Sequence, residues 1–344
     1  MKNFGISKNS TFIVAEIGNN HEGNFELAKK LILLASESGA DAVKFQTYNP
    51  YFYVTSDMKD RIKKLESFKL TYTQFAELSD YAKKCGVLFF STPFDIESSD
   101  FLNKIQQIFK ISSGDNNFYP LIDNISKFGK PIIISTGMSD SNGTKKIYNR
   151  ILKNWKKKGI SSELYLTHCI SSYPVPDKDA NLKLISKMIL EYPNAEIGYS
   201  DHTTGIEACL TAVSLGAKII EKHFTIDKNY SDFRDHQLSS DPKEFKNLVE
   251  SIRKVENLLG NGEDLIQESE KENIIQLRRS IAAKKDLPKG HKIEIDDIIW
   301  VRPGNGIPPG KENQVCGMIL NKNILKGQII KTNYLIDENF NFDN

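Results

Sequence analysis

The segment Ile197-Gly198-Tyr199-Ser200-Asp201-His202 opens a stretch that closes with Ile220-Glu221-Lys222-His223-Phe224-Thr225. Each segment has the apolar character of a short strand, and each reaches a histidine where the apolar run stops. The residues between them, Thr203 to Gly216, carry apolar side chains at helical spacing. A strand, a helix and a strand within about 30 residues form a βαβ unit, whose two strands run parallel. We therefore expect His202 and His223 at the same carboxyl end of one sheet, where α/β folds place their chemistry.

Two imidazoles at neighbouring strand ends can share a divalent metal ion and leave positions open for water and substrate. Glu221 precedes His223 by two residues, so the two side chains are expected on the same face of their strand. The alternative is that each histidine is an ordinary hydrogen-bonded residue at a strand end. The histidine pair predicts a candidate metal site, and the rest of the chain is needed to choose between these two interpretations.

Apolar runs alternate with helical patterns along the first 260 residues, giving eight predicted strands and eight predicted helices. Their number and the length of the segment are typical of a (β/α)₈ TIM barrel in residues 1–260. A doubly wound open sheet is the alternative, but no Gly-x-Gly-x-x-Gly turn follows any of the predicted strands.

The pattern changes after residue 260. Residues 261–277 are charged and contain glycine, which indicates a linker. Residues 278–336 contain short apolar runs separated by turns, which predicts a small β-rich domain. Two segments in it resemble each other, Asp286-Leu287-Pro288-Lys289-Gly290 and Asn323-Ile324-Leu325-Lys326-Gly327. Residues 337–344 read as a frayed tail.

Composition excludes several classes of partner. The chain has 344 residues, of which 39% are hydrophobic and 26% charged, and its net charge is +2 without a long basic run. Nucleic acid and membrane partners are therefore not expected. No signal-peptide pattern is present, and the four cysteines have neither metal nor disulfide spacing. We expect a cytoplasmic protein with reduced cysteines, of which Cys169 could alternatively act as a nucleophile.

The ends of the other predicted strands carry cations and hydroxyl groups. These residues would meet at one mouth of the barrel and suit a phosphate or carboxylate group; they are Lys44, Thr92, Lys110, Ser113 and Ser135. The alternative is a structural network in which the two lysines pair with Glu16 or Asp115. The anion site and the ion-pair network can both exist, because a lysine inside a strand must be paired when no ligand is bound. An anion site beside a metal site predicts an enzyme that acts on a phosphorylated or carboxylated small molecule.

Eight motifs follow one another in a familiar order. They are Ala15-Glu16-Ile17-Gly18-Asn19-Asn20-His21-Glu22-Gly23, Lys44-Phe45-Gln46, Ser91-Thr92-Pro93-Phe94, Lys110-Ile111-Ser112-Ser113-Gly114, Ser135-Thr136-Gly137-Met138, Tyr173-Pro174, Gly198-Tyr199-Ser200-Asp201-His202-Thr203 and Glu221-Lys222-His223-Phe224-Thr225. This set resembles the sialic acid synthase family, which makes nine-carbon keto sugar acids from phosphoenolpyruvate. The resemblance extends over residues 10 to 335, because the segment from Arg279 to Gly306 is similar to the family's C-terminal antifreeze-like (SAF) domain.

The resemblance implies a role for each group. Phosphoenolpyruvate would bind to the cations and hydroxyls named above, and His202 and His223 would hold Mn²⁺ or Mg²⁺. The other implied catalytic residues are Glu16, Asp115 and Glu221, and the implied contacts to an N-acetylmannosamine-type sugar are Gln46, Ser171, Tyr173, Asp235 and Arg302. In the family, the arginine of the Arg-Pro-Gly motif reaches the partner subunit's barrel. Arg302 therefore implies a domain-swapped homodimer.

Three positions depart from the family pattern, and all lie in the sugar half of the implied site or next to it. Asp115 stands where many relatives have glutamate, and Ser171 replaces a common asparagine. The segment Asp232-Phe233-Arg234-Asp235-His236 replaces a typical Gly-Pro-Asp segment, so either Asp235 or Asp232 would contact the sugar. We expect the reaction type to be retained, whereas the acceptor sugar need not be N-acetylmannosamine.

The predicted product is N-acetylneuraminate or a close relative, formed with release of phosphate. The first alternative is a synthase of legionaminic acid, or with less support pseudaminic acid, acting on a 2,4-diacetamido-2,4,6-trideoxy hexose. Two other classes are a non-catalytic sugar-binding homologue and a metal-dependent barrel isomerase or aldolase that does not use phosphoenolpyruvate. Retention of Glu16, Lys44 and both histidines argues against a non-catalytic homologue. The cluster of cations and hydroxyls argues against an isomerase or aldolase that does not use phosphoenolpyruvate.

Overall fold

The computed structural model describes residues 10–337. The chain divides between Gly260 and Asn261 into two compact units, which are described separately below. Residues 338–344, most of the predicted tail, lie outside the described residues.

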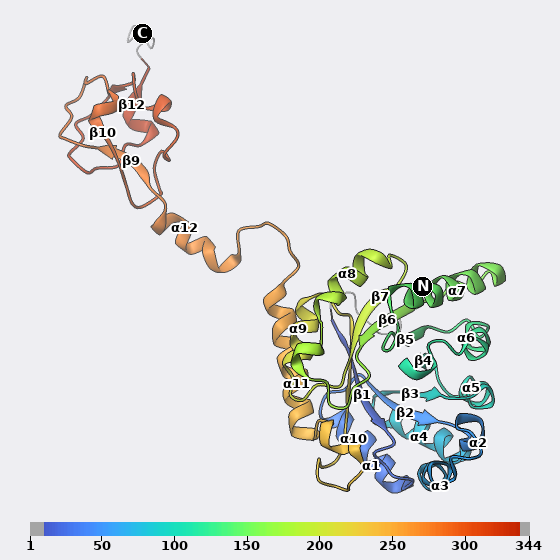
Figure 1. Ribbon diagram of the computed structural model, residues 1–344. Coiled ribbons are helices and arrows are strands. Elements are labelled where there is room, and N and C mark those ends of the chain that lie inside the picture. Colours follow the sequence, from blue (N-terminus) through green and yellow to red (C-terminus); the bar gives the residue numbers. More distant parts are fainter. Residues whose placement is uncertain (1–9, 338–344) are drawn as a thin grey trace. The chain divides into compact units, whose positions relative to one another are not determined.

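The first unit is built on eight parallel strands (Figure 1). These are β1 (Phe12–Gly18), β2 (Ala42–Thr47), β3 (Leu88–Pro93), β4 (Phe109–Ile111), β5 (Ile132–Ser135), β6 (Leu164–Cys169), β7 (Glu196–Asp201) and β8 (Ile219–His223). They are ordered β3-β2-β1-β8-β7-β6-β5-β4, with β8 hydrogen-bonded to β1 and with β3 and β4 in contact at the seam. The predicted barrel is confirmed, and the open doubly wound sheet is wrong, because its first and last strands would not pair.

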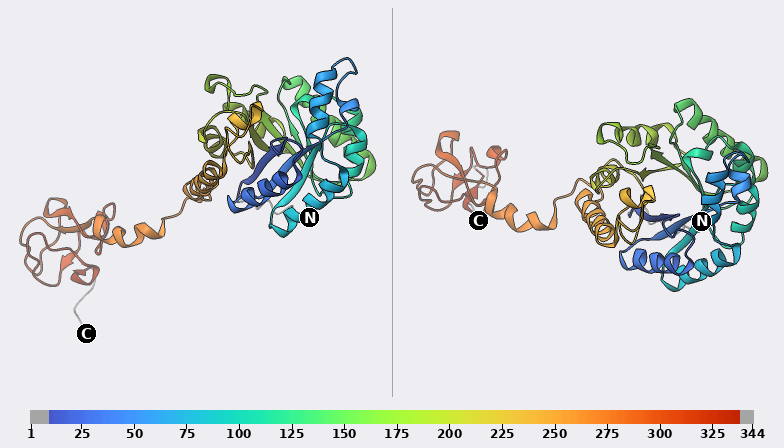
Figure 2. Two further views of the ribbon diagram at one scale, coloured as in Figure 1. Left: turned by 90° about the horizontal axis from the view of Figure 1, so that it is seen from below. Right: turned by 60° about the horizontal axis from the view of Figure 1, so that its bottom comes forward.

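Helices surround the strands in a ring, as the right view of Figure 2 shows. The eight that follow the strands along the chain are α1 (Phe25–Glu37), α4 (Tyr72–Lys84), α5 (Ile96–Leu102), α6 (Tyr119–Ser126), α7 (Ser141–Lys158), α8 (Lys183–Glu191), α9 (Glu207–Ser214) and α11 (Pro242–Leu259). Their apolar faces pack against the outward side chains of the strands in the largest hydrophobic cluster of the molecule.

The interior of the barrel has its own smaller core, which explains where the polar residues lie. Phe12, Val14, Ala42, Phe90, Ile108, Ile133, Tyr165 and Ile219 form this inner cluster. Side chains alternate between the two faces of a strand, so the residue two positions further also points inward. Those next inward positions are polar: Glu16 after Val14, Lys44 after Ala42, Thr92 after Phe90, Lys110 after Ile108, Ser135 after Ile133 and Glu221 after Ile219. The barrel therefore changes from an apolar to a polar interior towards its carboxyl end.

Two regions of the first unit contain helices that the sequence patterns do not predict. The polar insertion after β2 folds into α2 (Pro50–Tyr53) and α3 (Lys59–Phe68), and the segment after β8 contains α10 (Arg234–Leu238). Only Ile62 is buried in α3, so its apolar stripe is too narrow to stand out in a pattern of periodicity.

The second unit contains helix α12 (Lys271–Leu277) and two small antiparallel sheets. One pairs β9 (Ser280–Ala283) with β10 (Ile298–Val301), and the other pairs β11 (Ile319–Leu320) with β12 (Leu335–Ile336). The β-rich prediction is confirmed. Part of the predicted linker is helical instead, and the end of α12 is fixed to the small domain where Gly304 N–H donates to the Ile275 carbonyl at 2.7 Å.

The two similar segments of the small domain bind each other. Leu287 and Ile324 exchange backbone hydrogen bonds of 2.8 and 2.9 Å. The first side chain of each segment then accepts from the lysine N–H of the other, Asp286 from Lys326 and Asn323 from Lys289, both at 2.7 Å. The weak sequence repeat thus corresponds to a locally two-fold arrangement in the core of this domain.

No helix within residues 10–337 is long and apolar enough to cross a membrane. The four cysteines are all free.

Candidate active site

A cavity of about 650 Å³ opens at the carboxyl ends of the barrel strands. Apart from the alternative Asp232, the barrel residues that the sequence and the resemblance single out line it: Glu16, Lys44, Gln46, Thr92, Lys110, Ser113, Asp115, Ser135, Ser171, Tyr173, His202, Glu221, His223 and Asp235. Arg302 belongs to the second unit, where it directly follows β10. The barrel fold therefore brings the predicted anion, metal and sugar groups to one place.

Two glutamates and two lysines form a buried ion-pair chain at the bottom of the cavity. Lys44 Nζ lies 2.6 Å from Glu16 Oε2 and 3.7 Å from Glu221 Oε1, and Lys110 Nζ lies 2.8 Å from Glu221 Oε2. All four side chains are at most 7% exposed. The structural network expected as an alternative is thus present, with Glu16 and Glu221 as its carboxylates and without Asp115. Its total charge is balanced, because two cations face two anions.

The two carboxylates are not equivalent. Burial alone would raise the pKa of Glu221, but Lys110 and Lys44 together hold its pKa well below the usual range. Burial raises the pKa of Glu16 to about 7, opposed by Lys44 and reinforced by the negative Glu221. Glu16 can therefore exchange a proton near neutral pH, while Glu221 stays ionised. A carboxyl group with this behaviour suits acid–base chemistry.

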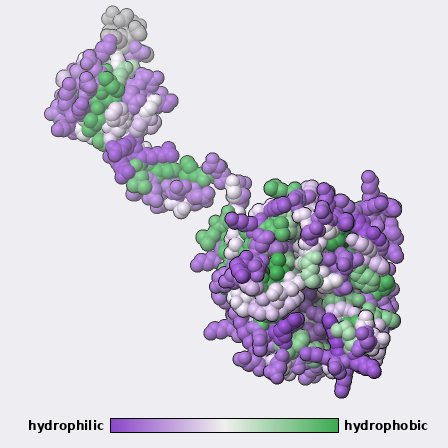
Figure 3. Space-filling view, in the orientation of Figure 1, coloured by the Kyte–Doolittle hydropathy of each residue, from purple (hydrophilic) through white to green (hydrophobic). Residues whose placement is uncertain are grey.

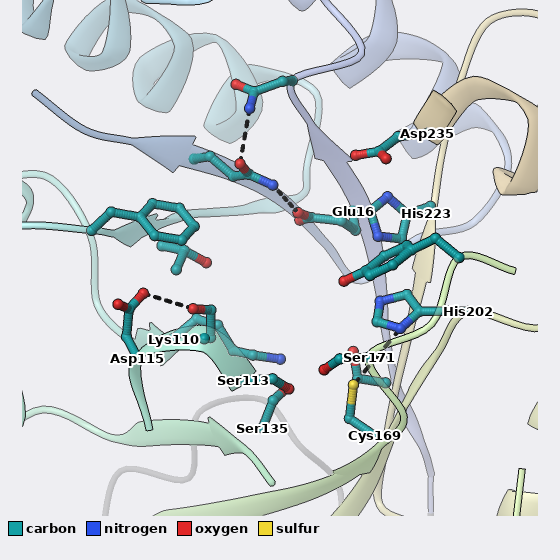
Figure 4. Close-up of a pocket in the computed structure, with 18 of the residues that line it drawn as sticks. Glu16, Lys110, Ser113, Asp115, Ser135, Cys169, Ser171, His202, His223 and Asp235 are labelled. Carbon is teal, nitrogen blue, oxygen red and sulfur yellow. Dashed lines mark hydrogen bonds between the residues drawn. The ribbon is translucent and has the colours of Figure 1, made fainter. Parts of the chain in front are cut away.

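Hydroxyl groups line the side of the cavity next to Lys110. The Ser113 and Ser171 hydroxyls are buried and have no hydrogen-bond partner among the described residues. A Cβ at Gly137 would lie 2.6 Å from both hydroxyl oxygens, so the two hydroxyls lie side by side, close against Gly137 (Figure 4). Buried hydroxyls without partners are costly. Both serines line the cavity, where a polar ligand would give these hydroxyls their partners, and Ser171 lies beside Ser113.

Two other hydroxyls complete this side of the cavity. Lys44 Nζ donates to Thr92 Oγ1 at 3.4 Å, and the Ser135 and Thr167 hydroxyls are 2.9 Å apart. The Asn116 amide donates to the carbonyls of Ser135 and Gly137 at 3.2 and 2.8 Å. This amide fixes the loop after β4 against the end of β5.

The two histidines lie side by side because β7 and β8 pair in register. Ser200 pairs with Glu221 and Asp201 with Lys222, so His202 and His223 are the next cross-strand neighbours. Their ring centroids are 5.3 Å apart. Behind them, Lys222 Nζ and Asp201 Oδ2 form a fully buried ion pair of 2.6 Å that joins the two strand ends.

The histidine nitrogens fit a cation. His202 Nδ1 lies 2.8 Å from the Ile170 carbonyl and donates to it, which leaves Nε2 with a free lone pair. His223 Nδ1 is buried without a partner in the described chain. Burial, followed by the positive groups around it, lowers the pKa of His223 well below its usual range, so it is neutral. Burial would lower the pKa of His202, but its contacts with Cys169 and with the Ile170 carbonyl raise it. An imidazole binds a metal ion in its neutral form, through a free lone pair. No group of three or more potential ligands occurs within residues 10–337, so a metal here would take its other ligands from substrate or water.

The amide of Gln46 is held between two neighbours. Asn19 Nδ2 donates to Gln46 Oε1 at 2.9 Å, and Gln46 Nε2 donates to Glu16 Oε1 at 3.3 Å. A Cβ at Gly18 would lie 3.1 Å from Glu16 Oε1 and 3.2 Å from Gln46 Nε2, and the φ of Gly18 is +54°. Glycine at this position therefore allows the glutamate and the amide to approach each other.

Asp115 lies apart from the ion-pair chain. Its Oδ2 accepts from the Ser112 hydroxyl at 2.8 Å, and burial raises its pKa despite that hydrogen bond. Figure 4 shows Asp115 across the cavity from His223 and Asp235. Its shorter side chain thus still lines the cavity.

The opposite wall of the cavity comes from loops and from the insertion. Asp235 lines the cavity and is buried, whereas Asp232 is exposed and does not line it. Next to Asp235, the Arg234 guanidinium lies 4.6 Å from the centre of the Tyr173 ring. The sequence reasoning missed six residues on or beside this wall: Asn19, Tyr53, Arg61, Leu65, Phe94 and Phe233. Asn19 and Phe94 stand in the quoted motifs and Phe233 in the segment after His223. The other three lie in α2 and α3, which the sequence patterns do not predict.

Three polar residues at the carboxyl end of β1 hold the loops instead of lining the cavity. Asn20, His21 and Glu22 follow β1, but they do not line the cavity. Asn20 Nδ2 donates to the Phe224 carbonyl at 2.9 Å, and Glu22 bonds His236. Burial lowers the pKa of His21 to about 4. These residues hold the loops that surround the cavity.

Comparison with known proteins places the chain in a family. The model of the NeuB family matches residues 31–264, and the model of the SAF domain matches residues 278–335. The chain belongs to the NeuB family. The two matched segments of this NeuB-family chain correspond to its barrel and to its small β-rich unit, so the SAF prediction is confirmed.

Among NeuB relatives, an uncharacterized protein of Methanocaldococcus jannaschii is 45% identical over 91% of this chain and 90% of its own length. The N,N'-diacetyllegionaminic acid synthase of Campylobacter jejuni is 39% identical over 93% of this chain and 99% of its own length. A solved structure also matches, the crystal structure of N-acetylneuraminic acid (sialic acid) synthetase from Leptospira borgpetersenii in complex with citrate, whose chain is 36% identical in sequence to this one. It superimposes with a TM-score of 0.73 and covers 80% of this chain and 94% of that one.

Proposed function

We propose that this chain is a nonulosonic acid synthase that condenses phosphoenolpyruvate with an open-chain acylamino hexose and releases phosphate. The observation that carries the proposal is the cavity, where two buried lysines, unpartnered hydroxyls and two neighbouring histidines converge. Family membership supports the same activity, since named relatives of the chain are acid synthases of this type.

Phosphoenolpyruvate would bind on the side formed by β2 to β5. Its phosphate and carboxylate would take the positive charges of Lys44 and Lys110 and the hydroxyls of Thr92, Ser113 and Ser135. In the free protein these lysines neutralise Glu16 and Glu221. An incoming anion therefore competes with both carboxylates, and proton uptake by Glu16, whose pKa is about 7, relieves the competition.

The reaction forms one carbon–carbon bond, and at C2 a carbon–oxygen bond to water forms while the one to phosphate breaks. C3 of phosphoenolpyruvate attacks the aldehyde carbon of the sugar, whose oxygen takes up a proton. Water adds to the resulting cation at C2 and loses a proton. The C2–O bond to phosphate then breaks, and the new C2 hydroxyl gives its proton to the leaving phosphate and becomes the keto group. Glu16 is the group suited to hold or give a proton near C2, and Asp115 is assigned to the water.

His202 and His223 would hold Mn²⁺ or Mg²⁺, with Glu221 and Tyr173 beside them. When bound, such a cation polarises a carbonyl group as a Lewis acid. Dialysis against a chelator should remove activity, and added Mn²⁺ should restore it. Activity that survives complete chelation would contradict this assignment.

Two sugars are candidates for the acceptor substrate. An N-acetylmannosamine-type sugar would make the chain a sialic acid synthase, as the name of the Leptospira relative suggests. A 2,4-diacetamido-2,4,6-trideoxy hexose would make it a legionaminic acid synthase, which the 39% identity to the Campylobacter enzyme favours. No observation raises the pseudaminic alternative above these two.

The test is phosphate release from phosphoenolpyruvate with Mn²⁺, using N-acetylmannosamine, 2,4-diacetamido-2,4,6-trideoxymannose or no sugar. Release that depends on either sugar supports the synthase and identifies its acceptor. Failure with both, on protein shown to bind Mn²⁺, would overturn these acceptors and leave the non-catalytic alternative.

We further propose that the active form is a homodimer in which Arg302 of one chain completes the partner's cavity. Apolar side chains of the segment before the SAF domain are exposed and would need a cover; they are Leu265, Ile266, Ile275 and Leu277 (Figure 3). Mixing Arg302→Ala chains with Glu16→Gln chains should restore activity, because a mixed dimer contains one intact site. No recovery in a mixture that exchanges subunits would contradict the swapped dimer.

A further inference from the structure

The loop after β8 carries Asp235 and is fastened to the loop after β1 by a buried histidine. His236 Nε2 lies 2.9 Å from Glu22 Oε1 and donates to it, while His236 Nδ1 lies 2.6 Å from the Thr225 hydroxyl. The Ser231 hydroxyl also donates to Glu22. His236 and Thr225 are fully buried. The imidazole thus bridges two segments that are more than 200 residues apart in sequence.

A second set of contacts holds the backbone carbonyl of Asp235 and the segment that follows it. The Ser239 hydroxyl donates to the Asp235 carbonyl at 2.5 Å and accepts from the Asn20 amide at 3.0 Å. The same amide donates to the Phe224 carbonyl at 2.9 Å. The Ser240 N–H in turn donates to the His223 carbonyl at 2.8 Å. Asp235 therefore lies in a short segment whose backbone and next side chain are both fixed.

The three bridged residues resemble the hydroxyl, imidazole and carboxylate of a nucleophilic triad, but they have another use. None of Thr225, His236 and Glu22 lines the cavity, and the Thr225 hydroxyl is fully buried. A nucleophile has to reach its substrate. The bridge is therefore a brace for the loop.

We propose that the His236 bridge to Glu22 and Thr225 positions the Asp235 carboxylate for the acceptor sugar. This inference rests on the proposed function, and it takes Asp235, which lines the cavity, as the aspartate that the family resemblance implies for the sugar. Asp235 is buried at 8% exposure and lines the cavity next to Tyr173. A carboxylate held in one place by its neighbours loses less conformational freedom when it binds a ligand. The brace thus acts on acceptor affinity through Asp235 and leaves the phosphoenolpyruvate side, built on other strands, untouched.

The experiment compares initial-rate kinetics of the full-length protein and its variants, with phosphate release as the readout. His236→Asn keeps a polar group near Thr225 but is too short to reach Glu22. We expect the acceptor KM to rise about tenfold, the size of a typical coupling between contacting residues, with the phosphoenolpyruvate KM unchanged. Lys228→Met is the matched control, because Lys228 ties the same loop to Glu244 at 2.7 Å, away from the cavity. This control should leave both KM values unchanged.

A double-mutant cycle separates positioning from general destabilisation. If His236 acts through Asp235, His236→Asn should add nothing to the acceptor KM once Asp235 is already Asn. An equal further rise in the double variant would overturn the inference, and so would an unchanged acceptor KM in His236→Asn. If His236→Asn fails to fold, Glu22→Gln gives the same test with a smaller change of shape. A wild-type protein without acceptor-dependent phosphate release would instead refute the proposed function, and the inference with it.

Discussion

The two walls of the cavity are built in different ways. The wall proposed for phosphoenolpyruvate consists of side chains on or directly after strands β2 to β5, such as Lys44, Lys110 and Ser135. Apart from Gln46 on β2, the wall assigned to the acceptor comes from the loops, from α10 and from the insertion, with residues such as Asp235, Arg234 and Tyr53. Strand positions are fixed by the pairing of the whole barrel, whereas loop positions depend on individual contacts such as the His236 bridge. The first wall is therefore suited to an invariant substrate and the second to a variable one.

The largest effect should come from a side chain that displaces the two hydroxyls beside Gly137. Gly137→Ala would place a Cβ 2.6 Å from the Ser113 and Ser171 hydroxyls. We expect phosphate release to fall roughly 100-fold, as displacements of about 1 Å in an active site do, with the circular dichroism spectrum unchanged. Gly114→Ala is the matched comparison, because its Cβ would meet only the Ser112 hydroxyl at 3.8 Å. A loss as large in Gly114→Ala would argue against a specific role for the close approach of the two hydroxyls to Gly137.

A smaller effect, confined to the acceptor, should follow from a change in the loop-borne wall. Asp235→Asn should raise the acceptor KM about tenfold, the range expected for a lost charge-assisted hydrogen bond, and leave the phosphoenolpyruvate KM as it is. The matched control is Asp232→Asn, because Asp232 is exposed and three residues away. If Asp232→Asn has the stronger effect on acceptor KM, the assignment of Asp235 is wrong.

The charge chain under the strand-borne wall predicts a pH dependence of stability. The pKa of Glu16 is raised to about 7 in the folded protein from a usual value of 4.5. An acid with a raised folded pKa binds its proton more tightly in the folded state, so its contribution is present below about pH 4.5 and is lost as pH rises to about 7. Glu16→Gln should not lose stability in this window. Urea unfolding of both proteins at pH 5 and pH 8 measures the difference, and a parallel change in both would contradict the raised pKa.

The smallest effect is expected at Cys169. Its Sγ lies 3.8 Å from His202 Nδ1, and it lines the cavity between the two walls. The proposed reaction contains no step for a thiol, so Cys169→Ser should keep most of the phosphate release. Abolished activity in a folded, metal-binding Cys169→Ser protein would revive the nucleophile alternative.

The sequence predicts the strand-borne wall better than the loop-borne one, and the reason is physical. Alternation along a strand determines that Lys44 and Lys110 face the interior once Ala42 and Ile108 do, so spacing alone places them. The insertion and the loop after β8 have no such rule. Helix α3 buries a single residue, Arg61 and Tyr53 reach the cavity from it and from α2, and the brace at His236 joins distant segments. The pairing of Glu16 and Glu221 through one lysine likewise depends on strand register that the sequence does not reveal.

Binding of phosphoenolpyruvate in the absence of any sugar tests the division of the cavity most directly. Isothermal titration would compare the wild-type protein with Ser113→Ala and with Asp235→Asn. The proposed division predicts that Ser113→Ala weakens phosphoenolpyruvate binding, because this variant lacks the hydroxyl that would contact the ligand. It predicts that Asp235→Asn leaves the Kd for phosphoenolpyruvate unchanged. Equal weakening in both variants, or no binding to the wild-type protein, would contradict the assignment of the strand-borne wall to phosphoenolpyruvate.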